Sequence, residues 1–336
     1  MSKLLNQLIT DEKKFKKDLY SSGPYWNYKN SITITEIKKK GLKDFRGYST
    51  GIGYSFTDSL VLDIKNELNW KGRLVRGIFA LPFLKKIFEG QLRITKNHLT
   101  DYLNNLSVVY ANNENVLKLI NKYKFNNTVD FGCLKKFKIK DKEYSTHYLD
   151  MADRIDKLSF KFDFSKLNSY FEIGGGFGAF THLLITNFPN IKKIIYLDIV
   201  PNIYVGTEYL RSHFGESVKD YLNFKNQKEI SFTNNNSLEI FCIPPWEIEK
   251  LNIKVDHFHN AASFVEMPHE VIKNYCKYIK KLNIRDISLI SYEKYDPKTT
   301  FKPDKLNNYF DNSLNVFRHS KLIDDYKINE IYLTSK

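Results

Sequence analysis

A glycine-rich turn that follows an apolar stretch is the part of the sequence best suited to hold a ligand. Residues 170–178 read YFEIGGGFG, and the glycines are Gly174, Gly175, Gly176 and Gly178. Glycine adopts positive φ without a steric penalty and lets the backbone approach a ligand closely. The amphipathic helix expected at residues 179–187 adds free N–H groups and the positive end of its dipole, which suit a carboxylate or a phosphate.

An acid at the end of the next apolar stretch completes this pattern. Asp198 follows residues 193–197 and lies 24 positions after Gly174; Ile199 comes next. An acid at the tip of the second strand is placed to bind the ribose hydroxyls of a nucleoside. The sequence therefore predicts a nucleoside-cofactor site. Gly174, Gly176 and Ala179 also satisfy the loose dinucleotide fingerprint, so NAD or flavin stays an alternative.

Glu172 favours a different cofactor. Together with Gly174, Gly176 and Gly178 it forms the pattern Glu-x-Gly-x-Gly-x-Gly. This pattern resembles the first motif of Rossmann-like methyltransferases that use S-adenosylmethionine (SAM). In that class the early acid orients the glycine turn, and the turn faces the amino acid part of the cofactor. The resemblance implies that SAM is the cofactor.

Composition indicates a folded globular protein. The chain has 336 residues, 42% of them hydrophobic and 15% aromatic, which is enough for one large domain or two ordinary ones. The apolar run at residues 77–84 is too short to span a membrane and contains Pro82, and no signal-peptide pattern is present. Cys133, Cys242 and Cys276 lack metal-type spacing, so we expect free thiols, no metal site and a cytoplasmic location.

The net charge of +14 has two readings. The lysines are spread along the chain, which is typical of a solvated basic surface. The alternative is a basic cleft that attracts an anionic acceptor, such as a nucleotide-linked sugar or an acidic glycan. No RNA-reading motif accompanies the lysines, so no nucleic-acid partner is expected.

Alternation of strands and helices predicts an α/β fold in the second part of the chain. We divide the chain into a mainly helical region, residues 1–150, and a Rossmann-like domain, residues 151–336. The expected sheet is mostly parallel, with an antiparallel last strand. Its strands are expected at residues 170–173, 194–197, 239–243, 255–260, 286–291 and 330–334, and its helices at residues 179–187, 203–213 and 269–281. In the first region, helices are expected at residues 4–9, 60–68 and 113–122, and turns at residues 22–24 and 47–53.

Three segments resemble the sugar O-methyltransferase family of bacterial surface-polysaccharide gene clusters. They are residues 171–178, residues 196–201 with 208–210, and residues 260–267, which read NAASFVEM and match that family's Asn-x-x-Ser-x-x-Glu-Met pattern. The resemblance implies transfer of a methyl group from SAM to a sugar hydroxyl. The chain departs from the family pattern at Ile199-Val200-Pro201, where an acid closely followed by Leu-Pro would be expected.

Methyl transfer to a hydroxyl requires positioning and a base that removes the hydroxyl proton. We expect Glu266 or His269 to be this base, with Asn260 and Ser263 shaping the cofactor and acceptor pocket. The alternative is that residues 266–269 only begin the next helix, where an acid favours the dipole. His257 and His259 face the same side of their strand and are expected to be buried rather than metal ligands.

Four aromatic residues and one arginine of the first region are candidates for an acceptor wall. They are Trp26, Tyr28, Phe45, Arg46 and Tyr48, although ordinary packing explains them equally well.

Two other function classes stay open. Pro244-Pro245-Trp246 resembles the motif of enzymes that methylate amino groups of nucleic acid or protein, but Ile243 replaces its polar residue. A binding module without activity is the second alternative, because a fold does not determine a function.

Overall fold

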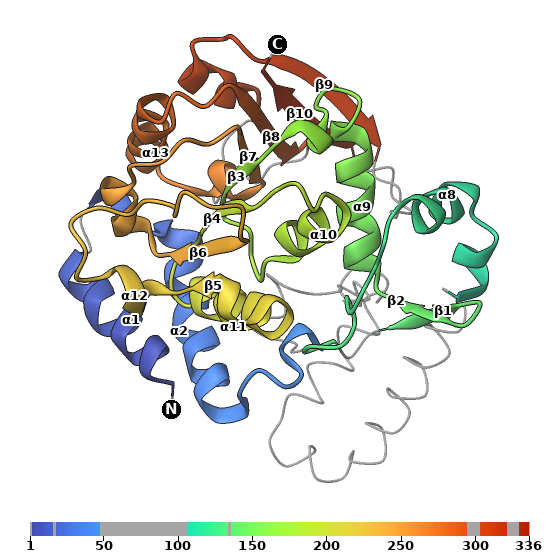
Figure 1. Cartoon of the computed structure of the whole chain (residues 1–336), viewed down its shortest axis with the longest axis horizontal. Helices are drawn as coiled ribbons and strands as arrows, with labels where there is room; N and C mark the ends of the chain where they lie inside the picture. Colours follow the sequence, from blue (N-terminus) through green and yellow to red (C-terminus); the bar gives the residue numbers. More distant parts are fainter. Residues whose placement is uncertain are drawn as a thin grey trace, which may run out of the picture.

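An eight-stranded sheet forms the centre of the computed structural model, which describes residues 2–15, 18–47, 107–133, 136–293, 303–320 and 329–335. The strand order is β5-β6-β4-β3-β7-β8-β10-β9. The strands run parallel apart from β10, which lies antiparallel between β8 and β9. Figure 1 shows this sheet nearly edge-on with helices on both sides.

The sheet strands are β3 (Ser169–Ile173), β4 (Lys193–Leu197), β5 (Val218–Lys219), β6 (Glu239–Ile243), β7 (His257–Ala261), β8 (Asp286–Tyr292), β9 (Asn315–Ser320) and β10 (Asn329–Thr334). A separate two-stranded sheet consists of β1 (Phe137–Ile139) and β2 (Lys142–Tyr144). The described α-helices are α1 (Lys3–Phe15), α2 (Gly23–Lys40), α8 (Glu114–Lys122), α9 (Thr146–Leu158), α10 (Ala179–Asn187), α11 (Asn202–Phe214), α12 (Tyr221–Phe224) and α13 (His269–Lys281).

Helices cover the two faces of the sheet according to the direction in which the chain moves. From β3 the chain passes through α10 to β4 and through α11 to β6, so α10 and α11 lie on one face. From β7 it moves the other way through α13 to β8, which places α13 on the opposite face, as Figure 1 shows. The reversal next to β3 leaves a crevice at the carboxyl ends of the strands, where open α/β sheets bind ligands.

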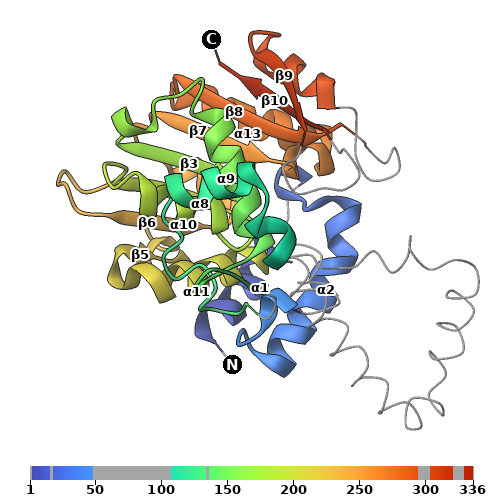
Figure 2. The same ribbon diagram turned by 90° about the vertical axis from the view of Figure 1, so that its right-hand side faces the viewer.

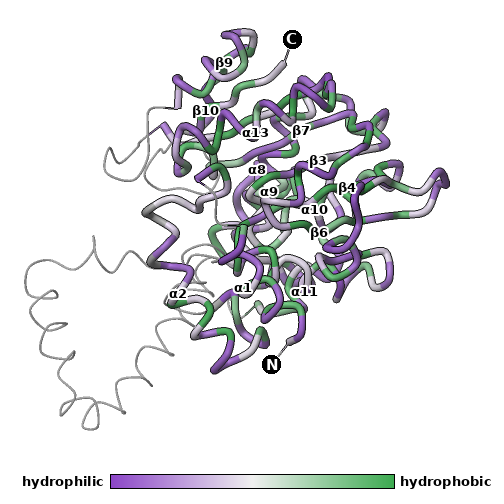
Figure 3. Tube along the Cα trace, turned by 90° about the vertical axis from the view of Figure 1, so that its left-hand side faces the viewer, coloured by the Kyte–Doolittle hydropathy of each residue, from purple (hydrophilic) through white to green (hydrophobic). Residues whose placement is uncertain are grey.

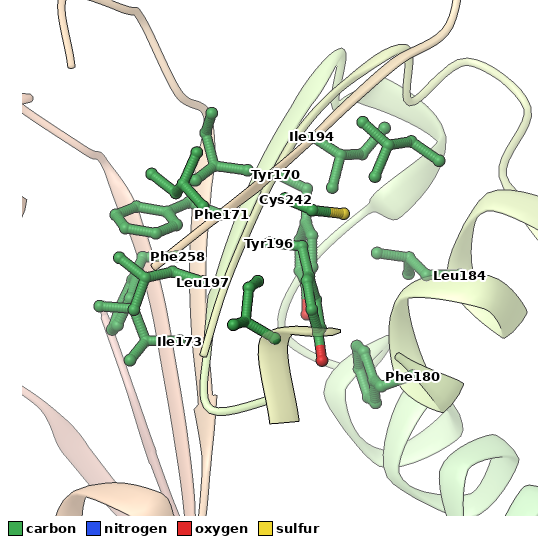
Figure 4. Packing of buried hydrophobic residues seen from close by; sticks show 14 of the residues in the cluster. Tyr170, Phe171, Ile173, Phe180, Leu184, Ile194, Tyr196, Leu197, Cys242 and Phe258 are labelled. Carbon is green, nitrogen blue, oxygen red and sulfur yellow. The ribbon is translucent and has the colours of Figure 1, made fainter. Parts of the chain in front are cut away.

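The central strands are continuous apolar stretches because both faces of the sheet are covered. Every residue of β3, β4 and β6 is buried. Figure 4 shows the alternation within them: Phe171 and Leu197 point to one side, whereas Tyr170 and Tyr196 point toward α10. Along the whole trace, Figure 3 shows hydrophobic residues concentrated in the central strands.

The N-terminal helices pack against this core rather than apart from it. Leu4, Leu5 and Leu8 of α1 and Ile37 of α2 belong to the same hydrophobic cluster as the sheet. Figure 2 shows α2 running along the side of the molecule toward the C-terminal strands. A smaller cluster joins α8 to the β1–β2 hairpin and includes Tyr110, Val116, Phe137, Ile139, Tyr144 and Leu149.

The predicted α/β class, with its parallel sheet and antiparallel last strand, is confirmed. Each predicted strand is present within two residues at either end, and α8 begins after its cap Asn113, whose side chain accepts the N–H groups of Asn115 and Val116. The turn expected at residues 22–24 is instead the start of α2, with Pro24 in its first turn. Helix α9 was not expected and runs across the boundary placed at residue 150, which stays a prediction.

Other sequence expectations have mixed outcomes. The helix expected at residues 60–68 and the turn at residues 48–53 lie outside the described residues. The three cysteines are free of disulfides, as predicted. None of the described helices has the length and apolar character that crossing a membrane requires.

Candidate functional site

A pocket of about 260 Å³ opens at the carboxyl ends of β3, β4, β7 and β8, beside the point where the chain reverses direction. Its position is the one that open α/β sheets use for ligands. The wall combines residues that the sequence analysis named with residues that it did not. The described lining residues are Ser21, Ser22, Trp26, Ile173, Gly174, Gly176, Leu197, Asp198, Ile199, Asn202, Ala261, Ala262, Ser263, Glu266, Met267, Tyr275 and Tyr292.

The glycine turn forms one wall of the pocket. Its backbone conformation and its close neighbours leave no room for a side chain at the glycine positions. Gly174, Gly176 and Gly178 have φ of +76°, +66° and +91°. A Cβ on Gly174 would lie 2.1 Å from Ser263 Oγ, and one on Gly175 would lie 2.6 Å from a ring carbon of Tyr196. The turn therefore brings bare backbone to the pocket, as a closely bound ligand requires.

Asp198 fixes this turn and also faces the pocket. Its Oδ2 accepts the Gly176 N–H at 2.9 Å, and its Oδ1 accepts the Ile199 N–H at 2.7 Å. Burial raises the pKa of Asp198 to about 7, while these two backbone donors favour the ionised form. Because each carboxylate oxygen can accept a second hydrogen bond, Asp198 retains capacity for ligand hydroxyls.

Glu172 lies beneath the turn rather than in the pocket. Its side chain faces α10, where Thr181 donates a hydrogen bond to it, and a Cβ on Gly175 would come within 2.8 Å of its carboxyl carbon. Burial raises the pKa of Glu172 to about 7. Glu172 therefore lies against the turn from below; that it orients the turn, as the resemblance implies, stays a prediction. Gly178 likewise lies outside the pocket wall, where it caps α10 and packs against Leu210.

Asn260 joins the carboxyl ends of two strands. Its amide donates to the Ile173 carbonyl at 2.8 Å and to Ser263 Oγ at 2.6 Å, and it accepts the Phe264 N–H at 3.2 Å. Asn260 is thus a buried joint, while Ser263 is exposed to the pocket. Of the two, only Ser263 lines the pocket; Asn260, predicted to bind the cofactor, lies behind it.

Glu266 is the second acid that lines the pocket. It ends the short 3₁₀ helix η6 (Ser263–Glu266), and its Oε2 accepts the indole N–H of Trp26 at 2.9 Å. Burial raises the pKa of Glu266 to about 7. His269, the other predicted base, is an exposed residue at the start of α13 whose imidazole bonds Tyr309, and it does not line the pocket. The structure thus brings Glu266, but not His269, to the pocket wall.

Several pocket residues were missed by the sequence analysis. Tyr275 of α13 lines the pocket, and no described residue hydrogen-bonds its hydroxyl; burial and Asp198 raise its pKa. It sits on the apolar face of an amphipathic helix, so its spacing is that of an ordinary core residue. Asn202, at the start of α11, bonds Asp198, and its place shortly after that acid was the available signal.

The histidine pair is buried, as predicted. His257 Nε2 and His259 Nδ1 each lie 2.8 Å from Ser288 Oγ. Burial lowers the pKa of His257 to about 4 and that of His259 well below its ordinary value, so both imidazoles are neutral. Within the described ranges, no group of histidine, cysteine and acidic residues has the arrangement of a metal site.

Two expected members of the acceptor wall lie elsewhere. Phe45 and Arg46 are fully buried, and the Arg46 guanidinium donates to the Thr128 carbonyl at 2.7 Å and to Ser145 Oγ at 3.0 Å. Neither residue lines the pocket, so the alternative of ordinary packing describes them. Trp26 does line the pocket, the Tyr28 side chain and Tyr48 lie outside the described parts, and Pro244 and Pro245 do not reach the pocket.

Fold and pocket together define a Rossmann-like α/β protein with a ligand site at the reversal point of its sheet. No family model and no curated protein sequence matches the chain.

Solved structures with a similar arrangement include a magnesium protoporphyrin IX methyltransferase from Synechocystis with bound SAM (12% identity, 56% of this chain, 80% of that chain, TM-score 0.38). A SAM-dependent methyltransferase from Aquifex aeolicus shares 14% identity over 57% of this chain and 94% of that chain, with a TM-score of 0.38. Human N-acetylserotonin methyltransferase in complex with SAM shares 12% identity over 56% of this chain and 53% of that chain, with a TM-score of 0.36. Similarity at this level does not establish a function for this chain.

Proposed function

We propose that the chain is a SAM-dependent methyltransferase that transfers a methyl group to a sugar hydroxyl. The observation that carries this proposal is that one pocket holds both a nucleoside-type wall and a separate acid. Gly174, Gly176 and Asp198 form the first, and Glu266 is the second. This combination suits a cofactor and an acceptor that meet in one place.

The cofactor half is assigned to the glycine turn and the acid that holds it. The bare backbone of Gly174 and Gly176 accommodates the amino acid part of SAM, and Asp198 accepts hydrogen bonds from the ribose hydroxyls. When bound, SAM supplies an electrophilic methyl group on a sulfonium. Tyr275, whose hydroxyl is available in the pocket, is a further donor for the bound ligands.

The acceptor half is assigned to Glu266 and Trp26. Glu266 accepts the proton of the acceptor hydroxyl while the new O–CH₃ bond forms and the S–CH₃ bond breaks. A base with a pKa near 7 is matched to this task at neutral pH. The face of Trp26 suits an apolar sugar surface.

The acceptor group that enters this pocket is proposed to be neutral. No lysine or arginine is among the described pocket residues, whereas Asp198 and Glu266 both are. A phosphate at this wall would find no cationic partner among the described lining residues. Where the acceptor is nucleotide-linked, its diphosphate is therefore expected to bind away from these residues.

Calorimetric titration of SAM into the full chain tests the proposal. We expect micromolar binding by the wild type, and a loss of at least tenfold in affinity for Asp198→Ala and Gly176→Val, because these changes remove a ribose partner and fill the backbone approach. Glu216→Gln, at an exposed position, is the control and should bind as the wild type does.

Absence of SAM binding by a folded wild type would overturn the proposal, and binding of NAD or flavin instead would favour an oxidoreductase. With SAM binding established, transfer of labelled methyl to neutral glycosides, nucleotide-sugars and RNA distinguishes the acceptor classes. Methyl incorporation confined to RNA would exclude the sugar acceptor.

A further inference from the structure

Helix α2 lies directly on the segment that carries Glu266. A Cβ placed on Gly23 would come 3.1 Å from Pro268 Cδ and 3.2 Å from the Glu266 carbonyl oxygen. One turn further along α2, the indole of Trp26 reaches the Glu266 carboxylate. Two independent contacts therefore connect α2 to residues 266–268, of which Glu266 and Met267 line the pocket.

The two oxygens of the Glu266 carboxylate have different surroundings. Oε2 accepts the Trp26 indole N–H at 2.9 Å, whereas Oε1 accepts no hydrogen bond from any residue in the described ranges. Glu266 lines the pocket, and its Oε1 is not enclosed by protein. One oxygen is thus held and the other is available to a ligand.

We propose that Trp26 is a positioning residue, whose indole N–H holds the Glu266 carboxylate in the orientation that presents Oε1 to the acceptor hydroxyl. This assignment rests on the function proposed above and adds a role for Trp26 beyond that of an apolar wall. A glutamate side chain has several rotatable bonds, so a single directional hydrogen bond at Oε2 restricts where Oε1 lies. Indole donates but cannot accept, so it bonds the carboxylate without competing for the acceptor proton.

The charge of Lys29 changes the pKa of Glu266 in the same direction as the hydrogen bond from Trp26 does. Burial raises the Glu266 pKa, and the Trp26 N–H and the Lys29 ammonium, also on α2, lower it. The other titratable groups that line the pocket within the described ranges are Asp198 directly after β4, Tyr275 on α13 and Tyr292 on β8. Removing the indole N–H should therefore raise the Glu266 pKa further and free the carboxylate to rotate.

Carbon-13 NMR of protein labelled at the glutamate carboxyl tests this role without cofactor or acceptor. Glu266→Gln identifies the Glu266 signal by its loss. In Trp26→Phe, which keeps an aromatic ring but lacks the N–H, we expect the Glu266 titration midpoint to move to higher pH. Thr35→Ala, on an exposed part of α2, is the matched control and should leave the midpoint where it is in the wild type.

The wild-type protein gives a second readout that does not depend on the folding of a Trp26 variant. The chain has three tryptophans, so the Trp26 indole N–H signal can be followed by ¹⁵N NMR. We expect this signal to titrate together with Glu266 and to stop titrating in Glu266→Gln. The proposal would be overturned if the titration midpoint of Glu266 were unchanged in folded Trp26→Phe. It would also be overturned if the chemical shift of the Trp26 indole N–H did not follow the titration of Glu266.

Kinetics separate this inference from the proposed function. Once an acceptor is in hand, Trp26→Phe should lower kcat with little change in the KM for SAM, and kcat/KM at pH 6.5 should fall roughly five- to tenfold as the acidic limb moves upward. Trp26→Phe should add nothing in the Glu266→Gln background. If the wild type fails to bind SAM, the methyltransferase assignment is wrong, but the joint titration of Trp26 and Glu266 in NMR can still be observed. If SAM binds and the two residues do not titrate together, only the role of Trp26 is wrong.

Discussion

At the scale of single residues, the pocket depends on positions where a side chain would not fit. Gly174 is the clearest case, because two separate requirements meet there. Its φ of +76° lies in the left-handed region, and the place of its missing Cβ is occupied by Ser263 Oγ. Any larger residue must therefore displace either the turn or the wall opposite.

Gly174→Ala is expected to weaken SAM binding by more than tenfold, as measured by calorimetry. The reason is the collision of the new methyl group with Ser263, since a real Cβ does not approach another heavy atom to 2.1 Å. Gly41→Ala is the matched control, because Gly41 has a similar φ of +68° but nothing within 4 Å of its Cβ position. Equal binding by the two variants would show that backbone strain, and not the collision, decides the effect.

Adding Ser263→Gly to Gly174→Ala removes the colliding hydroxyl. This double variant should recover part of the lost affinity, because only the backbone strain of about 1 kcal/mol then remains. Failure to recover any affinity in a folded double variant would contradict the steric explanation.

The sequence could predict the residues whose chemistry is local. Gly174, Asp198 and Glu266 were named because each follows a strand within a recognisable pattern, and the structure brings all three to one pocket. Tyr275 could not be found in this way, because on α13 it has the spacing of a core residue. The surroundings of Arg46 could not be predicted, because nothing near it in the sequence reveals that it bonds Thr128 and Ser145, far along the chain, in the interior.

At the scale of elements, the pocket wall depends on how the ends of β3, β7 and η6 are held together. Asn260 makes three hydrogen bonds there, to the Ile173 carbonyl, Ser263 Oγ and the Phe264 N–H. All of its amide groups are buried and used. The Asn260 side chain therefore holds the ends of β3 and β7 and the start of η6 together by hydrogen bonds.

Asn260→Asp is expected to destabilise the protein by about 2–4 kcal/mol in urea unfolding, because a carboxylate cannot donate to the buried Ile173 carbonyl. Asn307→Asp provides a comparison, since the Asn307 side chain also bonds backbone groups, those of Leu314, but does not line the pocket. SAM affinity should fall only in Asn260→Asp. A loss of stability without a loss of affinity would show that the joint does not shape the pocket.

Helices and strands could be predicted where the hydrophobic pattern and the length of a segment indicate the same type of element. The buried strands β3, β4 and β6 were anticipated, because parallel strands covered on both faces are unbroken apolar runs. Helices α10 and α13 were also anticipated, but only α13 is amphipathic; α10, expected to be amphipathic, is buried on all sides over residues 179–185. Strand β9 was missed, since Asn315–Ser320 is mostly polar and forms the outer edge of the sheet. Strand β9 forms because it pairs with β10, and this pairing cannot be inferred from the sequence of β9 itself.

At the scale of the whole molecule, three carboxyl groups tie folding to pH. Burial raises the pKa of Glu172, Asp198 and Glu266 to about 7 each. The folded protein therefore holds protons near neutrality that the unfolded chain releases at lower pH. The free energy of unfolding should accordingly fall as pH rises from about 4 toward 7.

Glu172→Gln isolates one of these groups. Because the Glu172 pKa rises from 4.5 to about 7 on folding, its contribution is fully present below pH 4.5 and is lost as pH rises through 7. Urea unfolding at pH 5, 6 and 7 should show a shallower decline in the variant, with a difference of about 2–3 kcal/mol across the interval. Glu216→Gln is the exposed control. Parallel curves for Glu172→Gln and the wild type would contradict this account.

The hydrogen bond between Trp26 and Glu266 joins residues that are 240 positions apart, and this separation has a consequence for synthesis of the chain. During translation, α2 leaves the ribosome long before its partner segment exists. The glycine turn and Asp198 can assemble while that segment is still missing, whereas the pocket gains its outer wall only after residue 268 has emerged. Ligand capacity is therefore expected to appear late, and contacts of such long range slow the final folding step.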